Sequence, residues 1–323
     1  MKLSIITINY NNAEGLRKTL ATVASQTFRD FEHIIVDGGS TDESVEIIRQ
    51  YADSEAIRQE GYEAIRQENS KADKQALSPH HLITSSPIIW ISEPDKGIYN
   101  AMNKGIEIAL GKRIVKSFNR SELVEDKNKG IEINKTEYLL FLNSGDCLVN
   151  ECTLGKVVEC NLVEDIVYGN SLQVWLNGNV KRAEYAHHVT GKTLFNHTIP
   201  HQASFIKSSL FESIGLYSED LRIGSDWEFY LKALFYHNCS FRYVDVDVCL
   251  FDMTGISTNK NLAQEMLDER VFVLKRIIPQ LYADYEEMNE NIRCLRMIDE
   301  RALRVGKIML KPYRIFKNLF FKK

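Results

Sequence analysis

The chain has 323 residues, of which 44% are hydrophobic, and a formal net charge of −4. This size predicts two domains or one large domain with an extension, and the balanced charge argues against a protein whose whole surface binds nucleic acid. The six cysteines form no Cys-x-x-Cys pair, so the common zinc and redox motifs are excluded.

The hydrophobic pattern predicts strands that alternate with helices. In chain order we expect strands at 3–8, 31–36, 88–91 and 138–142, helices at 13–26 and 98–110, a hairpin turning at Asn177–Gly178, a strand at 200–206 and a helix from 224. This order predicts an α/β fold, a three-layer sandwich with a mostly parallel sheet. We expect a catalytic domain at 1–255 and a helical extension at 256–323.

Two local duplications interrupt this pattern. Residues 55–60 recur at 63–68, and residues 103–108 recur at 128–133. Neither repeats often enough to form a solenoid, so we interpret both as surface insertions, near 53–80 and 112–135.

Polar residues follow the predicted strands directly. Asn9 and Tyr10 follow the first, Asp37 the second, Asp95 and Lys96 the third, and Asp146 the fourth. The carboxyl ends of parallel strands line one crevice, so these side chains are expected to face a common ligand. Carboxylates suit Mg²⁺ or Mn²⁺, and an aromatic ring suits a nucleotide base.

Other nucleotide-binding motifs are absent from the sequence. No Gly-x-Gly-x-x-Gly follows the first strand, and no Gly-x-x-x-x-Gly-Lys-Ser/Thr occurs, which disfavours a dinucleotide enzyme or a P-loop ATPase. The sequence also has no signal-peptide pattern and no apolar run of about 18 residues, so a cytoplasmic location is expected.

Several motifs occur in order along the chain, at 4–12, 36–42, 90–105, 141–146, 200–205 and 224–228. Together they resemble family 2 glycosyltransferases of the GT-A fold, in particular the bacterial branch that builds polysaccharide and O-antigen repeats. The resemblance covers roughly residues 1–255, apart from the two insertions. It implies an inverting hexosyltransferase that moves a sugar from a nucleotide diphosphate, with UDP preferred, to a glycan or lipid-linked hydroxyl.

The resemblance also implies roles for individual residues. Asp226 matches the catalytic base, and Asp146 matches the carboxylate that binds Mn²⁺ or Mg²⁺, with His201 as a second metal ligand. The donor-binding residues expected are Ile8, Asn9, Tyr10, Asp37, Lys96, Asn100, Asn103, Asn143, Ser144 and Gly145. Gly145 stands where an aspartate is common, which leaves Asp146 as the one charged ligand at this turn.

Structural alternatives remain for these residues. Ser225–Glu228 also fits a capping box, with Asp226 at the first helical position. Asp37 and Asp146 are also typical of turns that end strands, and His201 of a hydrogen-bonded core. The rival functions are a nucleotidyltransferase of the same fold and a non-catalytic nucleotide-sugar-binding protein.

The C-terminal segment is strongly basic. Residues 303–323 contain seven lysines and arginines and no acidic residue, mixed with bulky apolar side chains. A helix packed on the catalytic domain is one interpretation. We favour a peripheral contact with the anionic inner membrane surface, where a lipid-linked acceptor would lie.

Overall fold

The fold is described by a computed structural model that covers residues 2–54, 87–113, 115, 136–255 and 258–320. Most of the two expected insertions, near 53–80 and 112–135, lies outside these residues. The chain forms two compact units, Met1–Met266 and Leu267–Lys323. The functional division expected at residue 255 stays a prediction.

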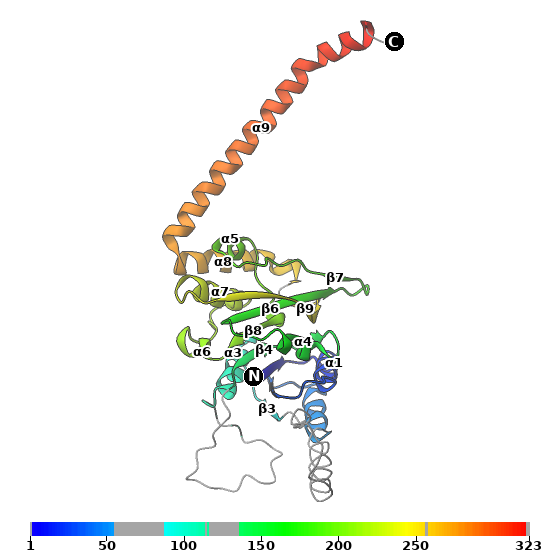
Figure 1. Cartoon of the computed structure of the whole chain (residues 1–323), viewed down its shortest axis with the longest axis vertical. Helices are drawn as coiled ribbons and strands as arrows, with labels where there is room; N and C mark the ends of the chain where they lie inside the picture. Colours follow the sequence, from blue (N-terminus) through cyan, green and yellow to red (C-terminus); the bar gives the residue numbers. More distant parts are fainter. Residues whose placement is uncertain (1, 55–86, 114, 116–135, 256–257, 321–323) are drawn as a thin grey trace, which may run out of the picture. The chain divides into compact units, whose positions relative to one another are not determined.

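The described residues of the first unit form a single mixed sheet. Its strands are β1 (Leu3–Asn9), β2 (Phe31–Asp37), β3 (Ile88–Ser92), β4 (Tyr138–Phe141), β5 (Cys147–Leu148), β6 (Ile166–Val174), β7 (Val180–Arg182), β8 (Ser204–Lys207) and β9 (Phe241–Asp252). Within the described part of the chain their order is β3-β2-β1-β4-β8-β6-β9-β5, with β7 paired to β6 (Figure 1).

The half of the sheet formed by β3, β2, β1 and β4 is entirely parallel, as the sequence predicts. Ile6 of β1 lies opposite Ile34 of β2 and Phe141 of β4. β1, β2 and β4 are buried along their whole length, which explains their continuous apolar runs. In the other half, β8 is antiparallel to β4 and β6, whereas β9 is parallel to β6, so the complete sheet is mixed.

Helices cover both faces of the parallel half. The helices are α1 (Ala13–Ala24), α3 (Ile98–Ala109), α4 (Thr153–Glu159), α5 (Gly191–Asn196), α6 (Leu210–Ser213), α7 (Ser225–Phe235), α8 (Ala263–Ile277) and α9 (Pro279–Phe320), with 3₁₀ turns η2 (His201–Ala203) and η4 (Lys260–Leu262). Ile5 shares a buried cluster with Val23 of α1, whereas the next residue, Ile6, contacts Gly105 of α3. Because successive strand residues point to opposite faces, α1 and α3 cover opposite faces, and the predicted three layers are present.

The predicted strand at 200–206 is wrong at its start. His201–Ala203 form the 3₁₀ turn η2, and β8 begins only at Ser204. The Pro200 carbonyl accepts hydrogen bonds from the Ala203 N–H at 3.1 Å and from the Ser204 hydroxyl at 2.6 Å. These bonds close a turn, which places His201 and Gln202 at the end of β8 that faces the site.

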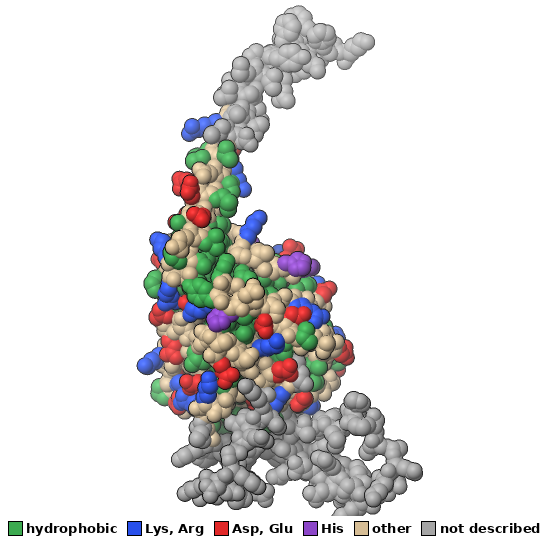
Figure 2. Space-filling view, turned by 60° about the vertical axis from the view of Figure 1, so that its left-hand side comes forward, with side chains coloured by type: hydrophobic (Ala, Val, Ile, Leu, Met, Phe, Trp, Pro, Cys, Tyr) green, Lys and Arg blue, Asp and Glu red, His purple; other side chains and the backbone are tan. Residues whose placement is uncertain are grey.

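The second unit consists of most of α8 and all of α9. Several apolar side chains near the start of α9 are exposed, among them Leu281, Met288, Ile292 and Leu295. Figure 2 shows hydrophobic side chains along this part of the helix. Of the helices in the described residues, none combines the length and the apolar character needed to cross a membrane.

Candidate active site

A cavity of about 510 Å³ lies at the carboxyl ends of β1 and β4. It also takes side chains from the start of α3, from η2, from the start of α7 and from the end of β9. The residues used below that line it are Ile8, Asn9, Tyr10, Asn12, Asp95, Tyr99, Asn143, Ser144, Asp146, His201, Gln202, Arg222, Asp226 and Asp252. Segments far apart in the sequence therefore meet at the sheet edge where a ligand was expected.

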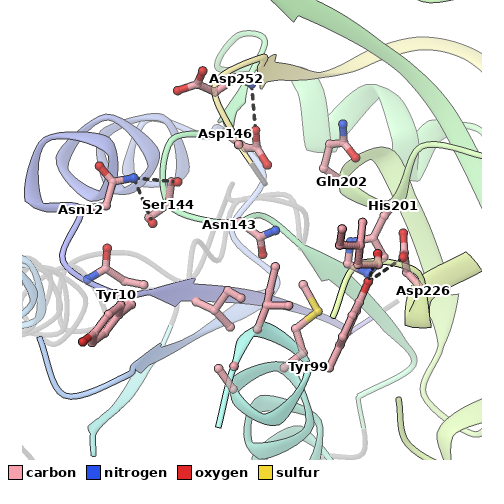
Figure 3. Close-up of a pocket in the computed structure, with 18 of the residues that line it drawn as sticks. Tyr10, Asn12, Tyr99, Asn143, Ser144, Asp146, His201, Gln202, Asp226 and Asp252 are labelled. Atoms are coloured by element: carbon pink, nitrogen blue, oxygen red, sulfur yellow. Dashed lines mark hydrogen bonds between the residues drawn. The ribbon is translucent and has the colours of Figure 1, made fainter. Parts of the chain in front are cut away.

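The turn after β4 is held by helix α1. The Thr19 hydroxyl donates to the Asp146 carbonyl at 2.7 Å and accepts from the Gly145 N–H at 3.0 Å. Gly145 has a φ of +108°, a backbone conformation that favours glycine. Asn12 donates to the Ser144 carbonyl at 3.0 Å, which ties the loop after β1 to the same turn (Figure 3). The carboxylate of Asp146 is thus carried by a fixed backbone.

Asp146 lies beside a second carboxylate that the sequence did not identify. Asp146 is 5% exposed, and its Oδ1 accepts a hydrogen bond of 3.0 Å from the backbone N–H of Asp252. Burial, together with the nearby Asp252 carboxylate, raises the pKa of Asp146 to about 7, although the backbone hydrogen bond favours the charged form. Figure 3 shows the two aspartates side by side at one side of the pocket. A buried carboxylate next to another carboxylate is a site where a cation relieves repulsion.

Asp226 lies on another side of the cavity, at the second residue of α7. The Tyr99 hydroxyl lies 2.9 Å from Asp226 Oδ1 and also contacts the Ile223 carbonyl. Burial and the adjacent Asp226 carboxylate raise the pKa of Tyr99 well above its usual range, so Tyr99 stays protonated and can donate. Tyr99 belongs to α3, so two helices fix this carboxylate.

The predicted capping box at the start of α7 is absent. The N-cap residue is Gly224, which has no side chain to donate or accept, and the Ser225 hydroxyl is buried without a partner in the described residues. Glu228 instead bonds the Ser218 hydroxyl and pairs with Lys232 at 3.2 Å. Asp226 is therefore not the first helical residue of a capping box, and its carboxylate faces the cavity and Tyr99.

His201 is buried against core aromatic residues and also lines the cavity. The residue is 8% exposed, and its ring stacks on Phe141 with centroids 4.9 Å apart and places Nε2 3.1 Å from the Tyr217 hydroxyl. Burial lowers the pKa of His201, against the opposing charge of Asp226, so the ring is neutral near pH 7. A neutral imidazole is compatible with both interpretations from the sequence, a metal contact or a hydrogen-bonded core residue.

Two amide oxygens in the cavity lining lack hydrogen-bond partners. The Oδ1 atoms of Asn9 and Asn143 are buried and have no partner among the residues that the structure describes. The other side-chain atom of Asn9, Nδ2, donates to Asp37 Oδ1 at 2.8 Å, which fixes the orientation of this amide. A buried acceptor without a donor costs about 1–3 kcal/mol, so both atoms suit contact with a ligand.

The structure brings together many of the residues expected from the sequence. Those that line the cavity are Ile8, Asn9, Tyr10, Asn143, Ser144, Asp146, His201 and Asp226. Asp37, Lys96, Asn100, Asn103 and Gly145 lie outside the lining. Asp37 is fully buried and accepts five hydrogen bonds, from the Asn9 amide, the Ser40 and Ser92 hydroxyls and two backbone N–H groups.

Asn100 and Asn103 connect α3 to residues 217–219. Asn103 donates to the Tyr217 carbonyl at 2.9 Å and accepts from the Tyr217 N–H at 2.9 Å, while Asn100 donates to Glu219 at 2.9 Å. The carbonyl oxygen of the Asn100 side chain accepts from the Lys96 N–H at 3.2 Å. These contacts hold α3 and Tyr99 in place next to Asp226.

Three charged residues of the cavity lining were not assigned a role from the sequence. Asp252 ends the alternating strand β9, and Arg222 precedes α7 and pairs with Glu265 at 3.1 Å. Asp95 was noted at a strand end but received no function. A turn signal after β9, Thr254-Gly255, is the only sequence feature that marks Asp252 as a strand-end carboxylate.

The aromatic, acidic and proton-accepting side chains lie on different sides of the pocket. In Figure 3, Tyr10 and Asp226 lie on opposite sides of the pocket, with Asn143 between them and Asp146 with Asp252 on a third side. A ligand with an aromatic base, a charged middle and a reactive far end fits this order. A half-buried carboxylate such as Asp226 can accept a proton from a group bound at that end.

Comparison with known proteins agrees with this description. Residues 4–118 match the family model "Glycosyl transferase family 2". A PGL/p-HBAD biosynthesis glycosyltransferase of Mycobacterium bovis (strain BCG / Pasteur 1173P2) is 27% identical over 267 residues, which cover 82% of each chain. An uncharacterized glycosyltransferase of Mycobacterium tuberculosis (strain CDC 1551 / Oshkosh) is 28% identical, over 80% of this chain and 78% of that one.

The fold is also similar to that of a solved structure. The crystal structure of S. aureus TarS 1-349 in complex with UDP has a TM-score of 0.50 and 17% identity, and the match covers 78% of this chain. This chain spans 60% of that protein, less than two thirds of its length. The family resemblance seen in the motifs is thereby confirmed: residues 4–118 match the family 2 glycosyl transferase model, the fold is of the GT-A type, and most of the chain is similar to proteins named as glycosyltransferases.

Proposed function

We propose that this protein is an inverting hexosyltransferase that moves a sugar from a UDP-sugar to a hydroxyl of a glycan or lipid-linked acceptor. One observation carries the proposal: a single cavity of about 510 Å³ joins Tyr10, the Asn143–Asp146 turn and Asp226. The UDP complex of the structurally similar TarS and the biosynthetic role named for the mycobacterial relative support the donor and the pathway class.

Asp226 is the proposed general base. Inversion requires the acceptor hydroxyl to attack the sugar from the face opposite the leaving diphosphate, and one carboxylate is enough to take its proton. Asp226 lies away from Asp146 in the pocket, which leaves room for the sugar between them (Figure 3). The Tyr99 hydroxyl holds one oxygen of the carboxylate, so the other oxygen is available to the acceptor.

The residues present fit a divalent cation, Mn²⁺ or Mg²⁺. Asp146, Asp252 and the unpartnered Oδ1 of Asn143 offer hard oxygen ligands, with His201 as a further candidate. The described residues contain no group of three or more His, Cys, Asp or Glu side chains able to hold a metal, so donor phosphates and water would supply the remaining ligands. When bound, such an ion neutralises the charge that develops on the leaving diphosphate.

The acceptor proposed is part of surface polysaccharide or O-antigen synthesis. The basic segment 303–323 supports a peripheral contact with an anionic inner membrane surface, where a lipid-linked acceptor is found. The side chains of 302–320 and residues 321–323 lie outside the described part of the structure, so this proposal depends on the sequence. No nucleic-acid partner is proposed.

A second candidate function is a non-catalytic nucleotide-sugar-binding protein of the same fold. The observation that favours it is the absence, within the described residues, of a three-ligand metal group, together with Gly145 at a position where an acid is common. This candidate predicts nucleotide binding that does not depend on a metal, and no turnover.

The test is a nucleotide-release screen with UDP-, GDP- and dTDP-sugars, Mn²⁺ and a lipid-linked acceptor, combined with calorimetry of UDP binding. We expect Asp226→Asn to lower turnover by about 10²–10⁴-fold while the Kd for UDP stays within about threefold. Glu43→Gln, whose side chain is 83% exposed, is the control. Full turnover by Asp226→Asn would exclude this base, and binding without turnover by the wild type would favour the second candidate.

A further inference from the structure

The loop that follows β3 brings a carboxylate against the loop that follows β2. A Cβ atom added to Gly38 would lie 2.3 Å from Asp95 Oδ2 and 3.2 Å from Cδ2 of the Tyr10 ring. The space that a side chain at position 38 would fill is therefore occupied by Asp95, next to Tyr10. Asp95 and Tyr10 both line the cavity, and Tyr10 is 64% exposed.

One oxygen of Asp95 is available to a ligand. Oδ1 accepts a hydrogen bond of 2.9 Å from the Gly97 N–H, whereas Oδ2 has no hydrogen-bond partner among the residues that the structure describes. Asp37, the carboxylate that the sequence placed among the expected donor-binding residues, is different in both respects. It has no exposed surface, and both of its oxygens are occupied by hydrogen bonds within the protein.

The loop of Asp95 is fixed before any ligand binds. Lys104 of α3 donates to the Pro94 carbonyl at 2.9 Å and pairs with Glu93 at 2.9 Å, and Arg113 also pairs with Glu93. The Glu93 N–H donates to the Asp37 carbonyl at 3.0 Å, which joins this loop to the end of β2. A carboxylate held in this way loses little conformational entropy when it accepts a hydrogen bond.

We propose that Asp95, rather than Asp37, reads the nucleotide base. Its Oδ2 accepts the imide N3–H of uracil while the base packs on the ring of Tyr10, and Gly38 leaves the room that this arrangement requires. An ionised carboxylate only accepts hydrogen bonds, so it favours uracil, whose N3 carries a hydrogen, over cytosine, whose N3 is an acceptor. This inference depends on the proposed function, because it assigns the base subsite of the same donor pocket.

The test is calorimetric binding of UDP and CDP, without acceptor, to the full chain and to Asp95→Asn. We expect the Kd for UDP to rise about 10- to 100-fold in Asp95→Asn, because a charged acceptor is replaced by an amide. The Kd for CDP is expected to stay the same or fall, since the new amide can donate to cytosine N3. Glu43→Gln is the matched control, with no change in either Kd expected.

Gly38→Ala provides an independent variant. Gly38 has no positive φ, so alanine acts through its Cβ, which displaces the Asp95 carboxylate and also crowds the Tyr10 ring; the UDP affinity is expected to fall at least as far as in Asp95→Asn. The double variant should lose little more than Gly38→Ala alone, because both changes remove the same hydrogen bond. Thermal unfolding and circular dichroism establish that each variant is folded.

The outcomes separate the two proposals. If the wild type binds no nucleotide, the proposed function fails. If the wild type binds UDP but folded Asp95→Asn keeps the same UDP affinity and the same ratio of UDP to CDP affinity, only the inference about Asp95 is overturned. A wild type that prefers GDP to UDP overturns the assignment to uracil, since guanine also offers N–H donors to a carboxylate.

Discussion

The two carboxylates proposed for catalysis and metal binding have different surroundings. Asp146 is almost fully buried beside the Asp252 carboxylate, and this burial and the neighbouring charge raise its pKa to about 7. Asp226 is half-buried and is held by the Tyr99 hydroxyl. The first environment favours a bound cation, and the second keeps a proton acceptor in place.

We predict that Asp146→Asn stabilises the metal-free protein at pH 8. The pKa of this carboxyl rises from an ordinary value of 3.8 to about 7 on folding, so the folded state binds an extra proton between these pH values. The burial of ionised Asp146 therefore lowers the free energy of unfolding. This loss grows as the pH rises through the window and reaches its full size above about pH 7. At roughly 1.4 kcal/mol per pH unit, the variant should gain up to a few kcal/mol.

Thermal unfolding with a metal chelator measures this effect at pH 8 and at pH 4. The gain should largely disappear at pH 4, where the wild-type carboxyl is neutral in the folded state. Glu14→Gln, an exchange on the exposed face of α1 with a side chain that is 74% exposed, should show no such pH dependence. A lower melting temperature for Asp146→Asn at pH 8 would contradict the assigned cost of burial.

At the scale of elements, α3 organises the far side of the cavity. Tyr99 at its start holds Asp226, and Asn103 one turn later holds the backbone of Tyr217. Both residues belong to the motif at 90–105 that the family resemblance includes. The helix therefore connects a motif known from the sequence with the start of α7, where the proposed base lies.

Tyr99→Phe is expected to lower kcat by about tenfold or more. The change removes one hydrogen bond to a charged acceptor, worth about 1.5–3 kcal/mol, without removing the ring that fills the core. The Kd for UDP should remain the same, because Tyr99 contacts Asp226, the proposed catalytic base, and not the expected nucleotide subsite. Tyr217→Phe, which removes a hydroxyl bonded to His201 but not to Asp226, is the matched comparison, and an equal loss of kcat there would refute a specific role for Tyr99.

Asn103→Ala is expected to destabilise the fold by about 2–4 kcal/mol. It leaves the Tyr217 N–H and carbonyl without their partners in a buried region, since Asn103 is 4% exposed. Urea unfolding measures the loss. From the sequence, Asn103 was expected to bind the nucleotide-sugar donor. That interpretation predicts instead a higher Kd for UDP with little change in the free energy of unfolding.

The sequence predicts the parallel half of the sheet well because each of its strands is a short, continuous apolar run followed by polar residues. It predicts Tyr10, Asn143 and Asp146 for the same reason, since their positions follow from local order. The contributions of Asp252 and Asp95 depend on pairing between distant segments. The Asp252 N–H reaches Asp146 only because β5 pairs with β9, and no local pattern encodes that register.

At the scale of the whole molecule, charge is distributed unevenly along the chain. The cavity lining contains four aspartates and, among its described residues, one basic side chain, Arg222. Residues 303–323 contain seven basic residues and no acidic one. The proposed cation in the acidic cavity and the proposed contact of the basic segment with anionic lipid are compatible if they act on different parts of the acceptor complex, its sugar and its lipid surface.

Replacing Lys307, Lys311, Arg314 and Lys317 with glutamine is expected to weaken binding to vesicles that contain anionic lipid. Each basic residue near such a surface contributes about 1 kcal/mol, so four should lower the partition coefficient by about two to three orders of magnitude at low salt. Sedimentation with anionic and with purely zwitterionic vesicles measures this. Turnover with a water-soluble acceptor should be unchanged, because the cavity lies in the first unit. Replacement of Arg17 and Lys18 on α1, whose side chains are 58% and 61% exposed, is compared with the double variant of Lys307 and Lys311, which removes the same number of charges. Equal loss of binding in these two double variants would show a response to total charge and would remove the support for a membrane contact through the C-terminal segment.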